Sequence, residues 1–131
     1  VDVSAAGTSE RVAVDTNALM MPVECDVRLF DELDRLLDDY ELVVPETVVA
    51  ELDKLAEGNG QEGVAASVGR DLVDRCTVVA TDESYADDAV LALGEECAYA
   101  VTNDKPLRQR LADAGVPVIC LRGEHKLAIT N

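Results

Sequence analysis

Four carboxylates occupy positions where a divalent cation and a phosphate group can meet. Asp15 directly follows the apolar segment RVAV, and Asp104 comes just after the apolar segment YAVT. Asp88 lies at the start of an Ala- and Leu-rich helical segment, and Glu51 lies one helical turn after Val48, beside an apolar stripe. Ligands of open parallel α/β sheets bind beyond the carboxyl ends of the strands. We therefore expect these acids to meet at that edge.

A shared cation would balance these charges, because an unpaired carboxylate beside a buried stripe is costly. Hard Mg²⁺ and Mn²⁺ prefer oxygen ligands, and beside a phosphate they activate water and stabilise the leaving oxygen. This chemistry hydrolyses a phosphodiester without a catalytic His, Cys or Lys. We expect Asp15 to be the central ligand, with Asp88 and Asp104 opposite. Glu51 is then a further ligand or a base that orients the water.

Polar neighbours on the same segments are expected to orient the acids through hydrogen bonds, as residues around metal ligands commonly do. They are Thr16, Asn17, Thr102 and Asn103. Each acid also has a purely structural interpretation. Asp104, Asp87 or Asp88 would suit the N-cap of a helix, and Asp15 would suit an Asx turn.

The elements that must position these residues alternate between strands and helices. Strands are predicted at 11–14, 41–44, 76–80, 99–102 and 116–121, and helices at 27–37, around 48–55, at 64–75, from 87 to about 97, and at 106–114. Short, nearly continuous apolar strands separated by helices indicate a parallel sheet covered on both faces. The fold class is therefore α/β.

Length and composition set further limits. The 131 residues fit one domain, predicted over 11–131, with 1–10 as a disordered lead-in. No apolar run reaches the length of about 18 residues that a membrane-spanning helix needs. The cysteines are widely spaced without a CxxC pair, and the only histidine is His125. This spacing argues against a zinc site or a disulfide scaffold and favours free thiols in a reducing cytoplasm.

The charge balance is extreme, because 27 acidic residues face 11 basic residues and give a formal net charge of −16. Dense surface carboxylate with little lysine is typical of proteins from salt-accumulating halophiles. Most of the acids are therefore expected to be solvated, so acidity alone identifies no site. The net charge also argues against nonspecific nucleic-acid binding through a basic face.

Four segments together resemble the successive motifs of PIN domains. They are VAVDTNALM, VVPETVVAELDKLA, YADDAVLALG and YAVTNDKPLRQRLADAGVPVICLRGEHKL, and they span about residues 11–127. Their order and spacing make the resemblance specific. AELDKL, YADD, TND and VICLRGEHKL are most similar to archaeal PIN proteins of the ribosomal-RNA-processing type. VapC-type ribonuclease toxins of the same family share the four acids.

The resemblance implies a three-layer α/β/α, Rossmann-like fold with a central five-stranded parallel sheet. It also implies a cytoplasmic, Mg²⁺- or Mn²⁺-dependent endoribonuclease that often forms dimers. It maps the four family acids to Asp15, Glu51, Asp88 and Asp104. The pattern D-A-V-L-A favours Asp88 over the adjacent Asp87, which becomes a supporting residue. The implied partners are RNA, a second copy of the chain, and an antitoxin or a ribosome-assembly protein.

Basic residues in the last quarter of the chain are candidates for RNA phosphate contacts flanking the metal site. They are Lys105, Arg108, Arg110, Arg122 and Lys126. The alternative for Arg108 and Arg110 is ordinary solvated helix surface. Two other classes also remain: a PIN module without activity, and a phospho-acceptor receiver domain. Receivers pair acids after the first strand, whereas this chain has one there, and acetyl-phosphate labelling would identify a receiver.

The acid excess predicts a salt dependence. Surface carboxylates without matching lysines repel one another, and molar salt shortens the Debye length to about 3 Å. We expect the midpoint of thermal unfolding to rise continuously from low to molar KCl. Melts across that range test this expectation, and an unchanged midpoint would contradict the halophilic interpretation.

Overall fold

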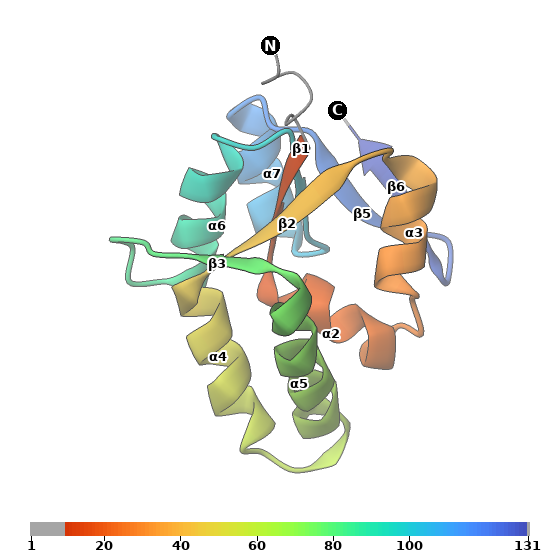
Figure 1. Cartoon of the computed structure of the whole chain (residues 1–131), viewed down its shortest axis with the longest axis vertical. Helices are drawn as coiled ribbons and strands as arrows, with labels where there is room; N and C mark the ends of the chain where they lie inside the picture. Colours follow the sequence, from red (N-terminus) through yellow and green to blue (C-terminus); the bar gives the residue numbers. More distant parts are fainter. Residues whose placement is uncertain (1–9, 131) are drawn as a thin grey trace.

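A six-stranded sheet forms the centre of the protein (Figure 1). The computed structural model describes residues 10–130. The strands are β1 (Glu10–Val14), β2 (Tyr40–Pro45), β3 (Thr77–Val79), β4 (Tyr99–Val101), β5 (Val118–Arg122) and β6 (Lys126–Thr130). Their order in the sheet is β3-β2-β1-β4-β5-β6. The first five strands are parallel, as predicted, and β6 adds an antiparallel edge strand next to β5.

The sequence did not predict β6 because its segment KLAIT is only partly buried and lacks the continuous apolar run of a central strand. Glu10 belongs to β1, so the expected lead-in over 1–10 is wrong at its last residue. Residues 1–9 lie outside the described part of the chain.

Strand β1 fixes where the site will form. Its residues Val12, Ala13 and Val14 are completely buried, and the strand is hydrogen-bonded between β2 and β4. Val14 of β1 lies opposite Val101 of β4 in the parallel register. The segments that follow these two residues therefore leave the sheet side by side, at its carboxyl edge.

Helices cover both faces of the sheet and surround this edge. They are α2 (Thr16–Glu24), α3 (Leu29–Leu36), α4 (Glu46–Ala56), α5 (Gly60–Leu72), α6 (Ala86–Gly94) and α7 (Lys105–Asp113), with a 3₁₀ turn η1 at Val73–Arg75. Helix α6 packs on β1, β2 and β4, α7 packs on β5, and α3 packs against β6 on the other side (Figure 1). The expected three-layer α/β arrangement is confirmed.

Helix α2 is an element that sequence periodicity did not predict. Its residues from Ala18 to Met21 are all buried, so it has no polar face to produce a 3.6-residue pattern. It packs closely against α5, where a Cβ atom on Gly69 would lie 2.9 Å from the Leu19 carbonyl oxygen and 3.2 Å from the Leu52 side chain. Glycine at 69 thus permits the close packing of α5 on α2 and α4.

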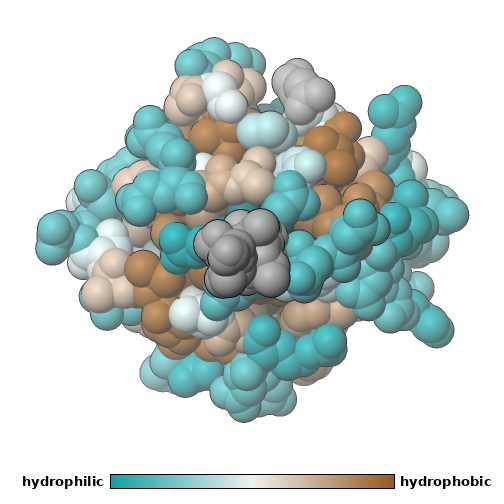
Figure 2. Space-filling view, turned by 45° about the horizontal axis from the view of Figure 1, so that its top comes forward, coloured by the Kyte–Doolittle hydropathy of each residue, from teal (hydrophilic) through white to brown (hydrophobic). Residues whose placement is uncertain are grey.

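Hydrophilic residues cover much of the face drawn in Figure 2, with apolar patches between them. Within residues 10–130 the exposed large hydrophobic residues are Val64, Val78 and Tyr85. The four cysteines are free thiols, of which only Cys120 is fully buried. None of the described helices combines the length and the apolar character needed to cross a membrane.

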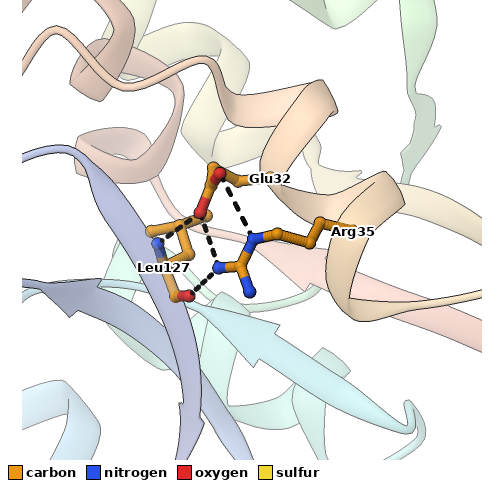
Figure 3. Close-up of polar contacts among 3 residues, drawn as sticks. All are labelled: Glu32, Arg35 and Leu127. Atoms are coloured by element: carbon orange, nitrogen blue, oxygen red, sulfur yellow. Dashed lines mark hydrogen bonds and ion pairs between the residues drawn. The ribbon is translucent and has the colours of Figure 1, made fainter.

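A polar contact attaches β6 to α3 (Figure 3). Oε1 of Glu32 accepts a hydrogen bond from the Leu127 amide at 2.9 Å, and Arg35 donates to the Leu127 carbonyl oxygen at 2.7 Å. Arg35 also donates to Oε1 of Glu32 at 2.8 Å. The hydrogen bond from Arg35, followed by that from the Leu127 amide, lowers the pKa of Glu32 below its ordinary value.

This contact predicts the behaviour of Glu32→Gln. Because the folded-state pKa is lowered, the ionised carboxylate stabilises the fold above the ordinary glutamate pKa, and this contribution disappears as the pH falls through the folded value. At neutral pH the substitution should lower the melting temperature by roughly 3 to 6 °C and speed amide exchange in β6. Melts and hydrogen exchange test this, with Glu83→Gln in an exposed loop as the control. Unaltered exchange in β6 would show that the contact does not hold the strand.

Candidate active site

Asp15 is the buried centre of the site, with a side chain only 3% exposed. It directly follows β1 and caps α2, where its Oδ1 accepts a hydrogen bond from the Thr16 amide at 2.7 Å. Its Oδ2 accepts two more, from Nδ2 of Asn17 at 2.8 Å and from Oγ1 of Thr102 at 2.8 Å. Donors from two parts of the chain therefore fix the orientation of this carboxylate.

The expected polar neighbours form one continuous network. Oγ1 of Thr102, at the end of β4, accepts hydrogen bonds from Nδ2 of Asn17 at 3.2 Å and from the Asp104 amide at 3.1 Å. Oδ1 of Asn17 accepts from the Asn103 amide at 2.9 Å, and Oδ1 of Asn103 accepts from the Leu121 amide at 2.7 Å. The network joins the ends of β1 and β4 to β5.

Asp15 opens into a cavity of about 300 Å³ at the carboxyl edge of the sheet. The lining residues are Asp15, Thr16, Asn17, Met20, Glu24, Glu51, Leu55, Glu62, Asp87 and Asp104. Three of the predicted acids, Asp15, Glu51 and Asp104, thus share one cavity. Glu24 and Glu62 join them without any local pattern that would have singled them out from the other surface acids.

Asp88, the third predicted acid, is not among the residues that line this cavity. Asp87 lines the cavity, whereas Asp88 accepts a hydrogen bond from Nη2 of Arg110 at 2.9 Å and forms an ion pair with it. Consecutive residues in a helix point about 100° apart, so only one of the pair faces the cavity. The geometry therefore places Asp87, rather than Asp88, beside the other acids of the cavity.

Two of the remaining acids are held by specific contacts. The hydroxyl of Thr16 donates to Oε1 of Glu51, although Glu51 is exposed rather than partly buried as its place beside the apolar stripe suggested. Oδ2 of Asp104 accepts from the Leu107 amide at 2.9 Å and so caps α7. The capping role considered for Asp104 is real and coexists with its place in the cavity.

Burial and mutual repulsion raise the pKa of two of these carboxyls. Burial raises the pKa of Asp15 to about 6, against hydrogen bonds from Thr102 and Thr16 that lower it, and Asp87 and Glu51 raise it further. Asp87 is more exposed, but its partial burial and then the neighbouring Asp104 and Glu51 also raise its pKa. The cavity thus concentrates negative charge that a cation would neutralise.

The donor set suits a hard divalent cation, because the titratable groups in the cavity are all carboxylates. Within residues 10–130, no three Asp, Glu, His or Cys side chains are close enough together to form a ready-made ion site. Mg²⁺ usually keeps several waters and binds proteins through one or two carboxylates. The carboxylates that line the cavity would suit that mode.

The basic residues expected beside the acids are divided among other places. Arg110 is paired with Asp88, and Nη1 of Arg108 lies 3.4 Å from Sγ of Cys120. Arg122 and Lys126 face each other across the β5–β6 hairpin. No basic residue is among the residues that line the carboxylate cavity in the described structure.

The raised pKa of Asp15 predicts a pH dependence in metal-free protein. Because the folded-state value of about 6 exceeds the ordinary 3.8, ionised Asp15 destabilises the fold above about pH 6 and this penalty is absent below about pH 4. As the pH rises from about 4 to about 6, the stability of Asp15→Asn relative to the wild type should therefore increase, by up to roughly 3 kcal/mol. Denaturant melts in EDTA measure the difference, with Asp71→Asn on α5 as a control. A pH-independent difference would contradict the raised pKa.

Known proteins resemble this chain in sequence and in fold. Ribonuclease VapC4 of Methanocaldococcus jannaschii is 27% identical over 118 residues, covering 86% of this chain and 90% of that protein. The PIN domain endonuclease Utp24 has a similar structure, with a TM-score of 0.73 and 27% identity over 91% of this chain and 90% of that chain.

Two more distant structures share the fold. A domain of a functionally unknown protein from Methanocaldococcus jannaschii has a TM-score of 0.60 and 20% identity, over 90% of this chain and 95% of that chain. VapBC2 from Rickettsia felis, solved with a DNA fragment from its promoter, has a TM-score of 0.54 and 11% identity, over 86% and 99%. Residues 12–124 match the family described as the PIN-like domain, and the chain belongs to that family.

Proposed function

We propose that this protein is a Mg²⁺- or Mn²⁺-dependent endoribonuclease that hydrolyses RNA phosphodiester bonds. The observation that carries the proposal is the buried carboxylate of Asp15, held by three donors at the base of a cavity lined by further acids. Membership of the PIN-like family supports it, as do relatives named as a ribonuclease and as an endonuclease.

The acids of the cavity have different proposed roles in hydrolysis. Asp15 is the principal ligand, because its three donors hold its oxygens in a fixed orientation before any ion arrives. Asp87 and Asp104 line the same cavity and would help to hold the ion. Glu51, held by the Thr16 hydroxyl, accepts a proton from the attacking water. The bound ion supplies Lewis-acid stabilisation of the phosphate oxygens.

The proposed role is RNA processing, with a toxin ribonuclease as the second candidate. The first follows from the resemblance of the AELDKL, YADD, TND and VICLRGEHKL motifs to PIN proteins of the ribosomal-RNA-processing type, and its proposed partner is a ribosome-assembly protein. The likeness to Utp24 supports endonuclease activity. The second follows from the resemblance to VapC-type ribonuclease toxins, supported by the likeness to Ribonuclease VapC4, and its proposed partner is an antitoxin. A small antitoxin-like reading frame immediately beside this one would favour the toxin, and its absence would favour processing.

The site assignment predicts a contrast between neighbouring aspartates. With Mn²⁺, Asp15→Asn, Glu51→Gln, Asp87→Asn and Asp104→Asn should each lose RNA cleavage at least about 100-fold, because each removes a group that binds the ion or the water. Asp88→Asn loses only the ion pair to Arg110 and should keep cleavage within about tenfold.

Cleavage of single-stranded RNA and the rise in melting temperature on adding Mn²⁺ measure the two effects together. The wild type should be stabilised by the ion through mass action, and Asp15→Asn should not be. If Asp88→Asn is inactive while Asp87→Asn cleaves normally, the third carboxylate is Asp88 after all. If every variant cleaves like the wild type, the site is elsewhere.

A further inference from the structure

A second cavity, of about 340 Å³, lies beside α7 and lacks negative charge. Its lining residues are Lys105, Arg108, Gln109, Ala112, Val116, Val118 and Thr130. The described lining therefore contains two cations and no carboxylate, in a chain with 27 acidic residues. The other described cavities all include carboxylates among their lining residues.

The guanidinium of Arg108 is poorly satisfied. Its Nη1 donates to Sγ of Cys120 at 3.4 Å, and a thiol sulfur is a weak acceptor. Its Nε is buried and has no hydrogen-bond partner within residues 10–130. Buried polar groups normally have partners, and an unsatisfied one is often explained by an ion or water. Arg108 is therefore a half-buried permanent charge that lacks an anion.

Lys105 adds a second charge at the same place. It is the exposed first residue of α7 and precedes Arg108 by three residues, so the two side chains lie on one side of the helix. The ion pairs that the structure shows elsewhere in the described chain involve Arg28, Arg35, Arg70 and Arg110. Neither Lys105 nor Arg108 has a carboxylate partner there.

The Lys105 end of this cavity is adjacent in the chain to the carboxylate site, whereas Val118, which also lines the cavity, is the first residue of β5. Asp104 lines the carboxylate cavity, Lys105 follows it directly, and Arg108 comes about one helical turn of 5.4 Å later. An anionic strand whose scissile phosphate lies beside Asp104 would place a neighbouring phosphate close to these two cations.

We propose that the cavity beside α7 binds a backbone phosphate of the RNA, next to the phosphate that is cut, through Lys105 and Arg108. This inference rests on the proposed ribonuclease function. The two cations attract the strand where the surrounding carboxylates would repel it, and they set its register over the acids. A carboxylate of a protein partner would fit the same charges, but the continuity with Asp104 favours the RNA strand.

The test uses RNA binding by the uncleaving Asp15→Asn protein in EDTA, measured with a short single-stranded oligoribonucleotide over a range of salt. Adding Lys105→Gln or Arg108→Gln should weaken binding roughly tenfold at low salt. Each should also reduce the slope of log affinity against log salt by about 0.7, the value for one phosphate contact on a single strand.

Matched variants separate charge from fold. Arg28→Gln removes the same charge from the exposed start of α3 and should leave the slope unchanged. Arg108→Lys keeps the charge and should retain the slope. Lys105 is exposed, so Lys105→Gln remains informative even if Arg108→Gln fails to fold.

Unchanged affinity and slope in Lys105→Gln and in a folded Arg108→Gln would overturn the inference. The inference would also be overturned if these variants lost binding to an acidic peptide while RNA binding stayed intact. It would likewise be overturned if saturating inorganic phosphate left RNA binding unchanged. Cleavage by the otherwise wild-type protein with Mn²⁺ is scored separately. If the wild type cleaves RNA but the salt slopes of Lys105→Gln and Arg108→Gln are unchanged, the phosphate site alone is refuted. If the wild type does not cleave RNA but these variants have reduced slopes, the phosphate contact is supported and the ribonuclease function is refuted.

Discussion

Burying a carboxylate inside an α/β fold is unfavourable unless hydrogen-bond donors surround it, and Asp15 meets this condition with three. The Thr16 amide is available only because α2 starts directly after β1. The Thr102 hydroxyl is available only because β4 lies next to β1. The same donors that make the burial tolerable also aim the carboxylate into the cavity. Local folding and the chemistry of the site therefore depend on one set of contacts.

The packing of helices extends this constraint to the outer acids. Gly69 lets α5 approach both α2 and α4, which brings Thr16 on α2 within hydrogen-bonding distance of Glu51 on α4. Asp87 and Asp104 come from α6 and from the cap of α7, and these helices pack on the sheet. The acids thus arrive from separate helices, and tertiary packing defines the cavity.

This division explains what sequence alone could predict. Asp15 and Asp104 were found because each follows a short apolar strand, and strand order places such residues at one edge. Helix α2 could not be predicted because Ala18 to Met21 are consecutively buried, which leaves no 3.6-residue periodicity. The choice between Asp87 and Asp88 depends on the rotation of α6 and on the ion pair with Arg110, neither of which is visible in the sequence. Arg108 and Arg110 also have different surroundings, and this difference depends on how α7 packs, which the sequence does not show.

β3 lies at one edge of the described sheet, where the acid excess bears on association between molecules. β3 has only three residues, Val78 is exposed there, and the loop that follows carries Asp82 and Glu83. An open edge invites pairing with another chain, and proteins commonly prevent this with charge, especially lysine. None of the chain's three lysines lies in β3 or in the loop after it, so the charges next to this edge are carboxylates. Salt weakens that repulsion between molecules at the same time as it relieves repulsion within the fold. Added salt therefore acts on both kinds of repulsion at once, within the molecule and between neighbouring molecules.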